Sequence, residues 1–270
     1  MAEMPNKQRA LGQNFFKSRR LVRGLIAATS INPMDTVYEI GPGEGIITRE
    51  LAAVAQQVVA IEKDPQLVVT LRRRLQDLDN VTIVEEDFLL HHVRARNYTI
   101  FGNIPFNRSA AIMRKLFYTI NPPQRAYLVL QSEAARKFAG LPHETQFSLL
   151  IKPWFELQIM RKLARTDFHP APKVNSVFLA VNRRKQPLIA AHETRAYRHF
   201  VKYGFRQWQW SLRLSYKAIF TYQQWKRLAC DLGFPLEATP TQLSLAQWVG
   251  LFGCFQRHVP PKKQVLICHK

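Results

Sequence analysis

The chain has 270 residues, of which 47% are hydrophobic, enough to fill the core of one large domain and a small one. Its 39 Lys and Arg against 19 Asp and Glu give a net charge of +20. This charge favours binding to nucleic acid over the alternative that the basic surface serves only to keep the protein soluble. No run of about 18 apolar residues occurs, no signal-peptide core is visible, and the three cysteines lack disulfide or zinc spacing. The composition therefore predicts a cytoplasmic protein with neither a membrane nor a metal partner.

Short β-branched runs alternate with amphipathic stretches from residue 36 onward, the pattern of crossover units in a mostly parallel sheet. Before them, Ser18 is expected to cap a helix that continues to Ser30 and that Asn32-Pro33 brings to an end. Ser109 is expected to cap a later helix. Strands are predicted at 36–40, 58–61, 81–84, 98–101, 126–130, 155–163 and 177–181, and helices at 46–55, 65–75 and 109–117. The fold class is therefore α/β, a doubly wound sheet with helices on its faces.

A charged segment that ends in proline, 182–187, follows the last predicted strand, and the strand pattern stops beyond it. We expect a first domain at 1–182 and a second, helical domain at 183–270. The second has predicted helices at 194–203, 221–232 and 244–255, with Gly233 as a helix stop. It carries 15 Lys and Arg but 3 Asp and Glu, a net charge of +12. This domain is either an RNA-facing module or a solvated basic face.

Residues 39–45 read EIGPGEG and connect the first predicted strand to a helix. Gly41 and Gly43 allow a tight turn and let a ligand approach the backbone. The spacing is G-x-G-x-G, not G-x-G-x-x-G, and no phosphate-binding lysine follows. An adenosine-containing ligand without phosphates therefore fits better than a dinucleotide or ATP.

Acidic residues follow the next two strands. Glu62 can accept hydrogen bonds from both ribose hydroxyls, although it could also be a solvated strand end. Asp87 can accept a bond from an adenine amino group, and Phe88 can flank the ring, although the run EEDF at 85–88 could be only a polar turn. Together they indicate a nucleoside-type cofactor.

The segment Asn103-Ile104-Pro105-Phe106 follows the fourth strand, at the edge where open α/β sheets bind ligands. Adenine N6 is a poor nucleophile because its lone pair is delocalised into the ring. The side-chain oxygen of Asn103 and the carbonyl of Ile104 can hold it in a tetrahedral geometry, while Pro105 stiffens the turn and Phe106 stacks on an extruded base. An ordinary Asn-x-Pro turn is the plainer interpretation of the same residues.

These motifs, together with LGQNFF at 11–16 and FHPAPKVNS at 168–176, resemble the rRNA adenine N6-dimethyltransferases over about residues 8–255. The resemblance implies a Rossmann-like methyltransferase fold and the cofactor S-adenosyl-L-methionine. Carried over position by position, it implies cofactor contacts at Asn14, Phe16, Gly41, Glu62, Asp87 and Asn103.

Within the family the chain looks more like the Erm methyltransferases than the KsgA-like enzymes, because of NIPF and the segment 216–221. This implies methylation of one 23S rRNA adenine in the peptidyl-transferase loop before the subunit is fully assembled, and resistance to macrolide, lincosamide and streptogramin B antibiotics. The alternatives are a KsgA-like dimethyltransferase of two adjacent small-subunit adenines and a non-catalytic RNA-binding protein. A monomer is expected.

Two segments depart from the family pattern. Residues 256–270 run past its usual end and are expected to be a flexible basic tail or an extra RNA contact. Trp208 and Trp210, between Arg206 and Arg213, either pack in the helical core or stack on unpaired bases.

Overall fold

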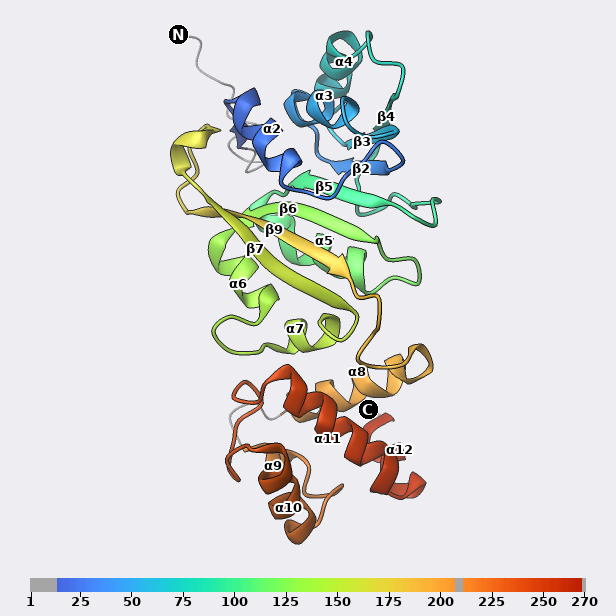
Figure 1. The fold of residues 1–270 in the computed structure, drawn as a ribbon, viewed down its shortest axis with the longest axis vertical. Helices are drawn as coiled ribbons and strands as arrows, with labels where there is room; N and C mark the ends of the chain where they lie inside the picture. Colours follow the sequence, from blue (N-terminus) through green and yellow to red (C-terminus); the bar gives the residue numbers. More distant parts are fainter. Residues whose placement is uncertain (1–13, 207–210, 269–270) are drawn as a thin grey trace. The chain divides into compact units, whose positions relative to one another are not determined.

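The computed structural model describes residues 14–206 and 211–268 (Figure 1). Leu11, Gly12, Gln13, Trp208 and Trp210, on which part of the sequence argument rests, lie outside the described residues. The chain folds as two compact units, one formed by Met1–Ala135 and Leu157–Arg183 and the other by Arg136–Glu156 and Arg184–Lys270. In the described ranges, no helix has the length and apolarity needed to cross a bilayer.

The first unit is built on a seven-stranded sheet in the order β4-β3-β2-β5-β6-β9-β7 (Figure 1). Neighbours from β4 to β6 are parallel, and β9 is antiparallel to β6. The strands are β2 (Thr36–Ile40), β3 (Gln57–Glu62), β4 (Val81–Glu85), β5 (Thr99–Asn103), β6 (Arg125–Gln131), β7 (Phe155–Leu163) and β9 (Ser176–Arg183). The predicted doubly wound, mostly parallel sheet is confirmed.

Strand order reverses on either side of β2, because the chain first adds β3 and β4 on one side and then β5 and β6 on the other. The carboxyl ends of β2 and β5 therefore form the switch point where such sheets bind ligands.

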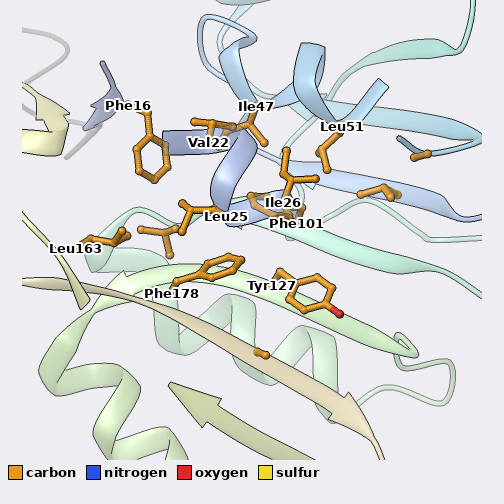
Figure 2. Packing of buried hydrophobic residues seen from close by; sticks show 14 of the residues in the cluster. Phe16, Val22, Leu25, Ile26, Ile47, Leu51, Phe101, Tyr127, Leu163 and Phe178 are labelled. Carbon is orange, nitrogen blue, oxygen red and sulfur yellow. The ribbon is translucent and has the colours of Figure 1, made fainter. Parts of the chain in front are cut away.

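Helices α2 (Arg19–Ala27), α3 (Ile46–Ala52), α4 (Pro65–Arg74) and α5 (Ser109–Phe117) accompany this sheet. Apolar side chains of α2 and α3 pack with the sheet residues Phe101, Tyr127 and Phe178 in one buried cluster (Figure 2). The cluster includes Val37 of β2 and Ile47 and Leu51 of α3, so it packs together the two elements that flank the glycine-rich turn.

Two predicted helix ends were wrong, since α2 and α3 each end three residues earlier than expected, and the predicted cap of α5 was wrong as well. Helix α2 is capped by Ser18 as expected, but it ends at Ala27, where the Thr29 hydroxyl donates to the carbonyl of Ile26 and stops the helix before Asn32. Ser109 does not cap α5. It is the first helical residue, after the 3₁₀ turn η1 (Phe106–Arg108), and its Oγ donates to the Phe106 carbonyl at 3.0 Å.

A two-stranded antiparallel sheet was not predicted. It pairs β1 (Phe15–Phe16) with β8 (Phe168–His169), which follows the 3₁₀ turn η2 (Arg165–Asp167). Strands of two residues are too short to show a period of two. The Phe16 and Phe168 rings lie 4.7 Å apart, so two motifs far apart in sequence meet here.

The second unit is helical. Its elements are the end of α6 (Ser132–Ala139), α7 (Gln146–Ile151), η3 (Ala191–Glu193), α8 (Thr194–Gly204), α9 (Leu212–Ser215), α10 (Tyr222–Leu232), α11 (Leu245–His258) and α12 (Pro261–Cys268). The three predicted helices are confirmed, and Gly233 ends α10 in the left-handed conformation with φ 68°. Residues 261–268 form a helix, not a flexible tail, and Ile267 is buried.

The segment 136–156 belongs with the second unit, although the sequence placed it in the first. Trp154 explains this, because its ring packs edge-on against Tyr197 at 5.8 Å and its Nε1 donates to the carbonyl of Ile189. Arg184 also donates from Nε to the Lys152 carbonyl. Such contacts between distant segments leave no local sequence signal.

Candidate active site

The glycine-rich turn between β2 and α3 has three residues with positive φ: Gly41 (64°), Gly43 (60°) and Gly45 (84°). A side chain at Gly43 could not fit, because a Cβ there would lie 2.3 Å from Cε1 of Phe15. Gly41 is exposed, and a Cβ added to it would meet nothing within 4 Å. The backbone of the turn at Gly41 is therefore accessible to a ligand.

Glu62, the last residue of β3, is held in a fixed orientation. It is 2% exposed; its Oε2 accepts from the Gly43 amide at 3.2 Å, and its Oε1 accepts from the amides of Lys63 (2.9 Å) and Asp64 (3.1 Å). A carboxylate offers about four acceptor positions, so about one remains for a ligand hydroxyl. The backbone bonds keep the carboxylate ready for that ligand.

The loop after β4 presents Asp87 and Phe88. Asp87 Oδ1 accepts from the Leu89 amide at 2.8 Å, which orients the carboxylate, and its Oδ2 lies 3.9 Å from Arg108. Phe88 is 5% exposed.

Lys115 on α5 secures this loop, a role that sequence reasoning missed. Its Nζ donates to the Leu89 carbonyl at 2.8 Å and lies 5.4 Å from the centre of the Phe88 ring. Burial lowers the pKa of Lys115, while the carboxylates of Glu86 and Asp87 act in the opposite direction. No sequence signal marks this lysine, because its partners are a backbone carbonyl and a ring 26 and 27 residues away.

Two hollows lie at the carboxyl edge of the sheet. The first, which we call the acidic hollow, has Glu62, Asp87 and Phe88 in its wall, together with Gly41 and Pro105; its remaining walls come from Ile40, Ile61, Lys63, Glu86, Leu89, Arg108 and Ile112. The second, which we call the amide hollow, is lined by Asn14, Phe15, Gly41, Asn103, Ile104, Pro105 and Phe106. Gly41 and Pro105 line both hollows, so the two are adjacent.

Asn103 is the last residue of β5. Its Nδ2 donates to the carbonyl of Asn14, so the amide group is oriented with Oδ1 as its acceptor. The Ile104 amide donates to Val129 at 3.0 Å and its side chain is 2% exposed, which anchors the backbone. Pro105 and Phe106 are partly exposed at the rim.

The structure places Phe15, not Phe16, at the amide hollow. Phe16 is 6% exposed and belongs to the buried cluster of the first unit (Figure 2). Adjacent residues of an extended strand point in opposite directions, so the pairing of β1 with β8 buries one ring and presents the other. Gly43, buried beneath Phe15, reaches neither hollow directly.

Glu39 was not singled out from the sequence, yet it is the most perturbed carboxyl of this region. It lies in β2 with no exposed surface, and neither carboxyl oxygen has a hydrogen-bond partner among the described residues. Burial raises its pKa to about 8; the neighbouring Thr48 side chain opposes this shift, and the charge of Glu62 adds to it. At neutral pH this carboxyl is therefore mostly protonated.

The residues of the acidic hollow fit an adenosine ligand. Glu62 and Asp87 offer acceptors for hydroxyl and amino groups, and Ile61, Phe88 and Ile112 offer apolar surface for a ring. The bare backbone at Gly41 gives such a ligand room to approach. In the described ranges, no group of three or more His, Cys, Asp or Glu side chains could hold a metal ion.

A family model described as Ribosomal RNA adenine dimethylase matches residues 4–256. An rRNA adenine N-6-methyltransferase of Bacillus licheniformis is 27% identical over 252 residues, which cover 92% of this chain and 87% of that protein. A Ribosomal RNA small subunit methyltransferase A of Acaryochloris marina is 31% identical over 261 residues, covering 92% and 97% respectively.

The fold is similar to that of the 23S rRNA methyltransferase ErmE, with a TM-score of 0.83 and 28% identity over 90% of this chain and all of that one. The match to the family model covers residues 4–256, which is more than half of the chain. The chain therefore belongs to the ribosomal RNA adenine dimethylase family, enzymes that use S-adenosylmethionine to methylate N6 of adenine in ribosomal RNA.

Proposed function

We propose that this enzyme methylates one adenine of 23S rRNA, in the peptidyl-transferase loop, and so confers resistance to macrolide, lincosamide and streptogramin B antibiotics. The observation that carries the chemical part is the adjacency of the two hollows through Gly41 and Pro105. One hollow suits a nucleoside cofactor and the other suits a base, so a methyl group can pass between them at their shared wall.

On the cofactor side, Glu62 would accept from the ribose and Asp87 from the adenine amino group, with Phe88 against the ring. Asn14 and Asn103 would contact the cofactor near the amide hollow. S-Adenosylmethionine supplies a methyl group on a positively charged sulfur, and the bare backbone at Gly41 lets that group approach the shared wall.

On the base side, Asn103 Oδ1 and the Ile104 carbonyl would accept the two hydrogens of the adenine amino group. This pair draws N6 toward a tetrahedral geometry and frees its lone pair. Phe106 would stack on the extruded base, worth roughly 1 to 3 kcal/mol. With the cofactor bound, the N6–C bond would form as the C–S bond breaks, and N6 would release a proton to water, so in-line placement would supply most of the rate.

The choice of 23S rRNA is supported by NIPF at 103–106, by the segment 216–221, and by the likeness to ErmE. A small-subunit target is the second candidate, because the Acaryochloris marina relative is 31% identical and its name specifies the small subunit. The two candidates predict methylation of different RNA molecules.

Mapping of N6-methyladenines on both rRNAs from a sensitive host that expresses the chain separates the candidates. We expect one modified adenine on 23S rRNA and growth in the presence of a macrolide. Two adjacent modified adenines on the small-subunit RNA, without resistance, would favour the second candidate. Asn103→Ala in the same host is the inactive control.

We also propose that the chain acts as a monomer in the cytoplasm on incompletely assembled RNA, and that residues 1–182 perform catalysis while 183–270 bind RNA. The net charge of +12 in residues 183–270 supports the second role.

A further inference from the structure

Helix α8 carries a row of cations on one side. Arg195, His199 and Lys202 follow one another at spacings of four and three residues, and Arg206 comes four residues later. The backbone bond from the Arg206 amide to the Tyr203 carbonyl continues the helical path past the end of α8. Spacings of three and four place side chains on one face of a helix. We call these four residues the α8 cation row.

The row lies opposite the face by which α8 packs. The buried residues of the helix recur at the same spacings, half a turn away from the row: Tyr197, Phe200, Val201 and Gly204. Arg195, Lys202 and Arg206 are exposed, and His199 is partly exposed. Arg195 and Lys202 are therefore presented outward, whereas His199 is partly covered and Arg206 also lies 5.1 Å from the centre of the Tyr203 ring.

Among the described residues, three of the four members of the row lack an acidic partner. Arg195, His199 and Lys202 form no ion pair with any residue in the described part of the chain, and no Asp or Glu occurs between 194 and 206. Some basic side chains elsewhere in the same unit have carboxylate partners: Lys152 with Glu144, Arg184 with Glu156, and Arg213 with Glu237. Surfaces of soluble proteins commonly have charges of both signs interspersed.

The pKa of His199 reflects the positive potential of this face. Its pKa is lowered first by burial and then by Arg195, Lys202 and Arg206. A potential that disfavours a proton on His199 favours an anion placed over the same face.

We propose that the α8 cation row is a contact surface for the phosphate backbone of the RNA substrate. At 1.5 Å rise per residue, the row extends over roughly 17 Å, long enough to face several consecutive phosphates. The inference rests on the proposed function, because it takes ribosomal RNA as the substrate. It goes beyond that function by naming the surface of the protein that contacts the RNA phosphates.

The test measures the salt dependence of binding between the full chain and a short RNA hairpin with an unpaired adenine. The double variant Arg195→Gln, Lys202→Gln should lower the slope of log K against log salt by about 1.4 to 1.8, because each lost phosphate contact removes about 0.7 to 0.9. The matched control is Lys217→Gln, Lys226→Gln, which loses the same charge at two exposed lysines outside the row. The control should change the slope by less than half as much.

An unchanged slope in the row variant, or an equal fall in the control, would overturn the inference. Unaltered circular-dichroism spectra and unfolding midpoints in both variants show that they fold. Transfer of a tritiated methyl group from S-adenosylmethionine to rRNA by the wild-type chain is measured alongside. Transfer with an unchanged slope in the row variant refutes the row alone, whereas absence of transfer refutes the proposed function.

Discussion

At the residue scale, the candidate chemistry depends on how single side chains are held. Asn103 is oriented by its bond to the Asn14 carbonyl, and Glu62 by three backbone amides. Both side chains are therefore oriented before a ligand binds, so binding costs little of their conformational entropy.

Asn103→Ala removes one acceptor for the adenine amino group. We expect methyl transfer to fall by at least about 100-fold, the usual cost of losing one preorganised polar group at a reacting centre. Affinity for S-adenosylmethionine should stay within about tenfold, because a single hydrogen bond contributes about 1 kcal/mol. Single-turnover assays and calorimetry measure the two, and the exposed neighbour Asn107→Ala is the control. Near wild-type turnover would contradict the assigned role.

Glu39→Gln tests the buried carboxyl. The folded pKa is raised to about 8 from an ordinary value of 4.5. Between these values the unfolded chain has released its proton while the folded chain retains it, so stability falls as pH rises from 4.5 to 8 and then levels off. The slope from this group is at most about 1.4 kcal/mol per pH unit. Urea unfolding at pH 6 and pH 8 should show a smaller loss in the variant. Parallel losses in the two proteins would mean that Glu39 is ionised when folded.

At the element scale, α5 controls the loop after β4. Lys115 donates to the Leu89 carbonyl and covers the Phe88 ring, so α5 connects the loop that carries Asp87 to the rest of the sheet. Within this loop Phe88 is buried and Leu90 is exposed.

Lys115→Met should loosen this loop and raise the Kd for S-adenosylmethionine about 5- to 10-fold, because it removes one charged hydrogen bond and one cation–π contact. Apolar contacts of the methionine side chain should offset part of this loss. The turnover number at saturating cofactor should change little, because Lys115 lies away from the amide hollow. Lys115→Arg should restore part of the affinity. Arg114→Met, at the exposed neighbouring position on α5, is the control. An equal rise in Kd in that control would show a general charge effect.

At the scale of the whole molecule, the sequence indicated the fold class, the strands and the charged second unit, because these follow from local periodicity and composition. The motifs at strand ends were expected to converge because parallel strands share one carboxyl edge, and Glu62, Asp87 and Asn103 do reach that edge. The roles assigned to these residues stay predictions.

The tertiary structure decided what local patterns cannot express. It placed Phe15 at the amide hollow and Phe16 in the core, because pairing of β1 with β8 chooses which face of a two-residue strand is buried. It joined 136–156 to the second unit through Trp154, and it brought Lys115 onto the loop after β4. The sequence by itself determined the seven strands of the main sheet, most of the helices around them, and the position of each motif at the end of its strand. Tertiary packing determined which of two neighbouring side chains faces a hollow and which is buried in the core. That choice depends on the energy of contacts between residues far apart in the chain.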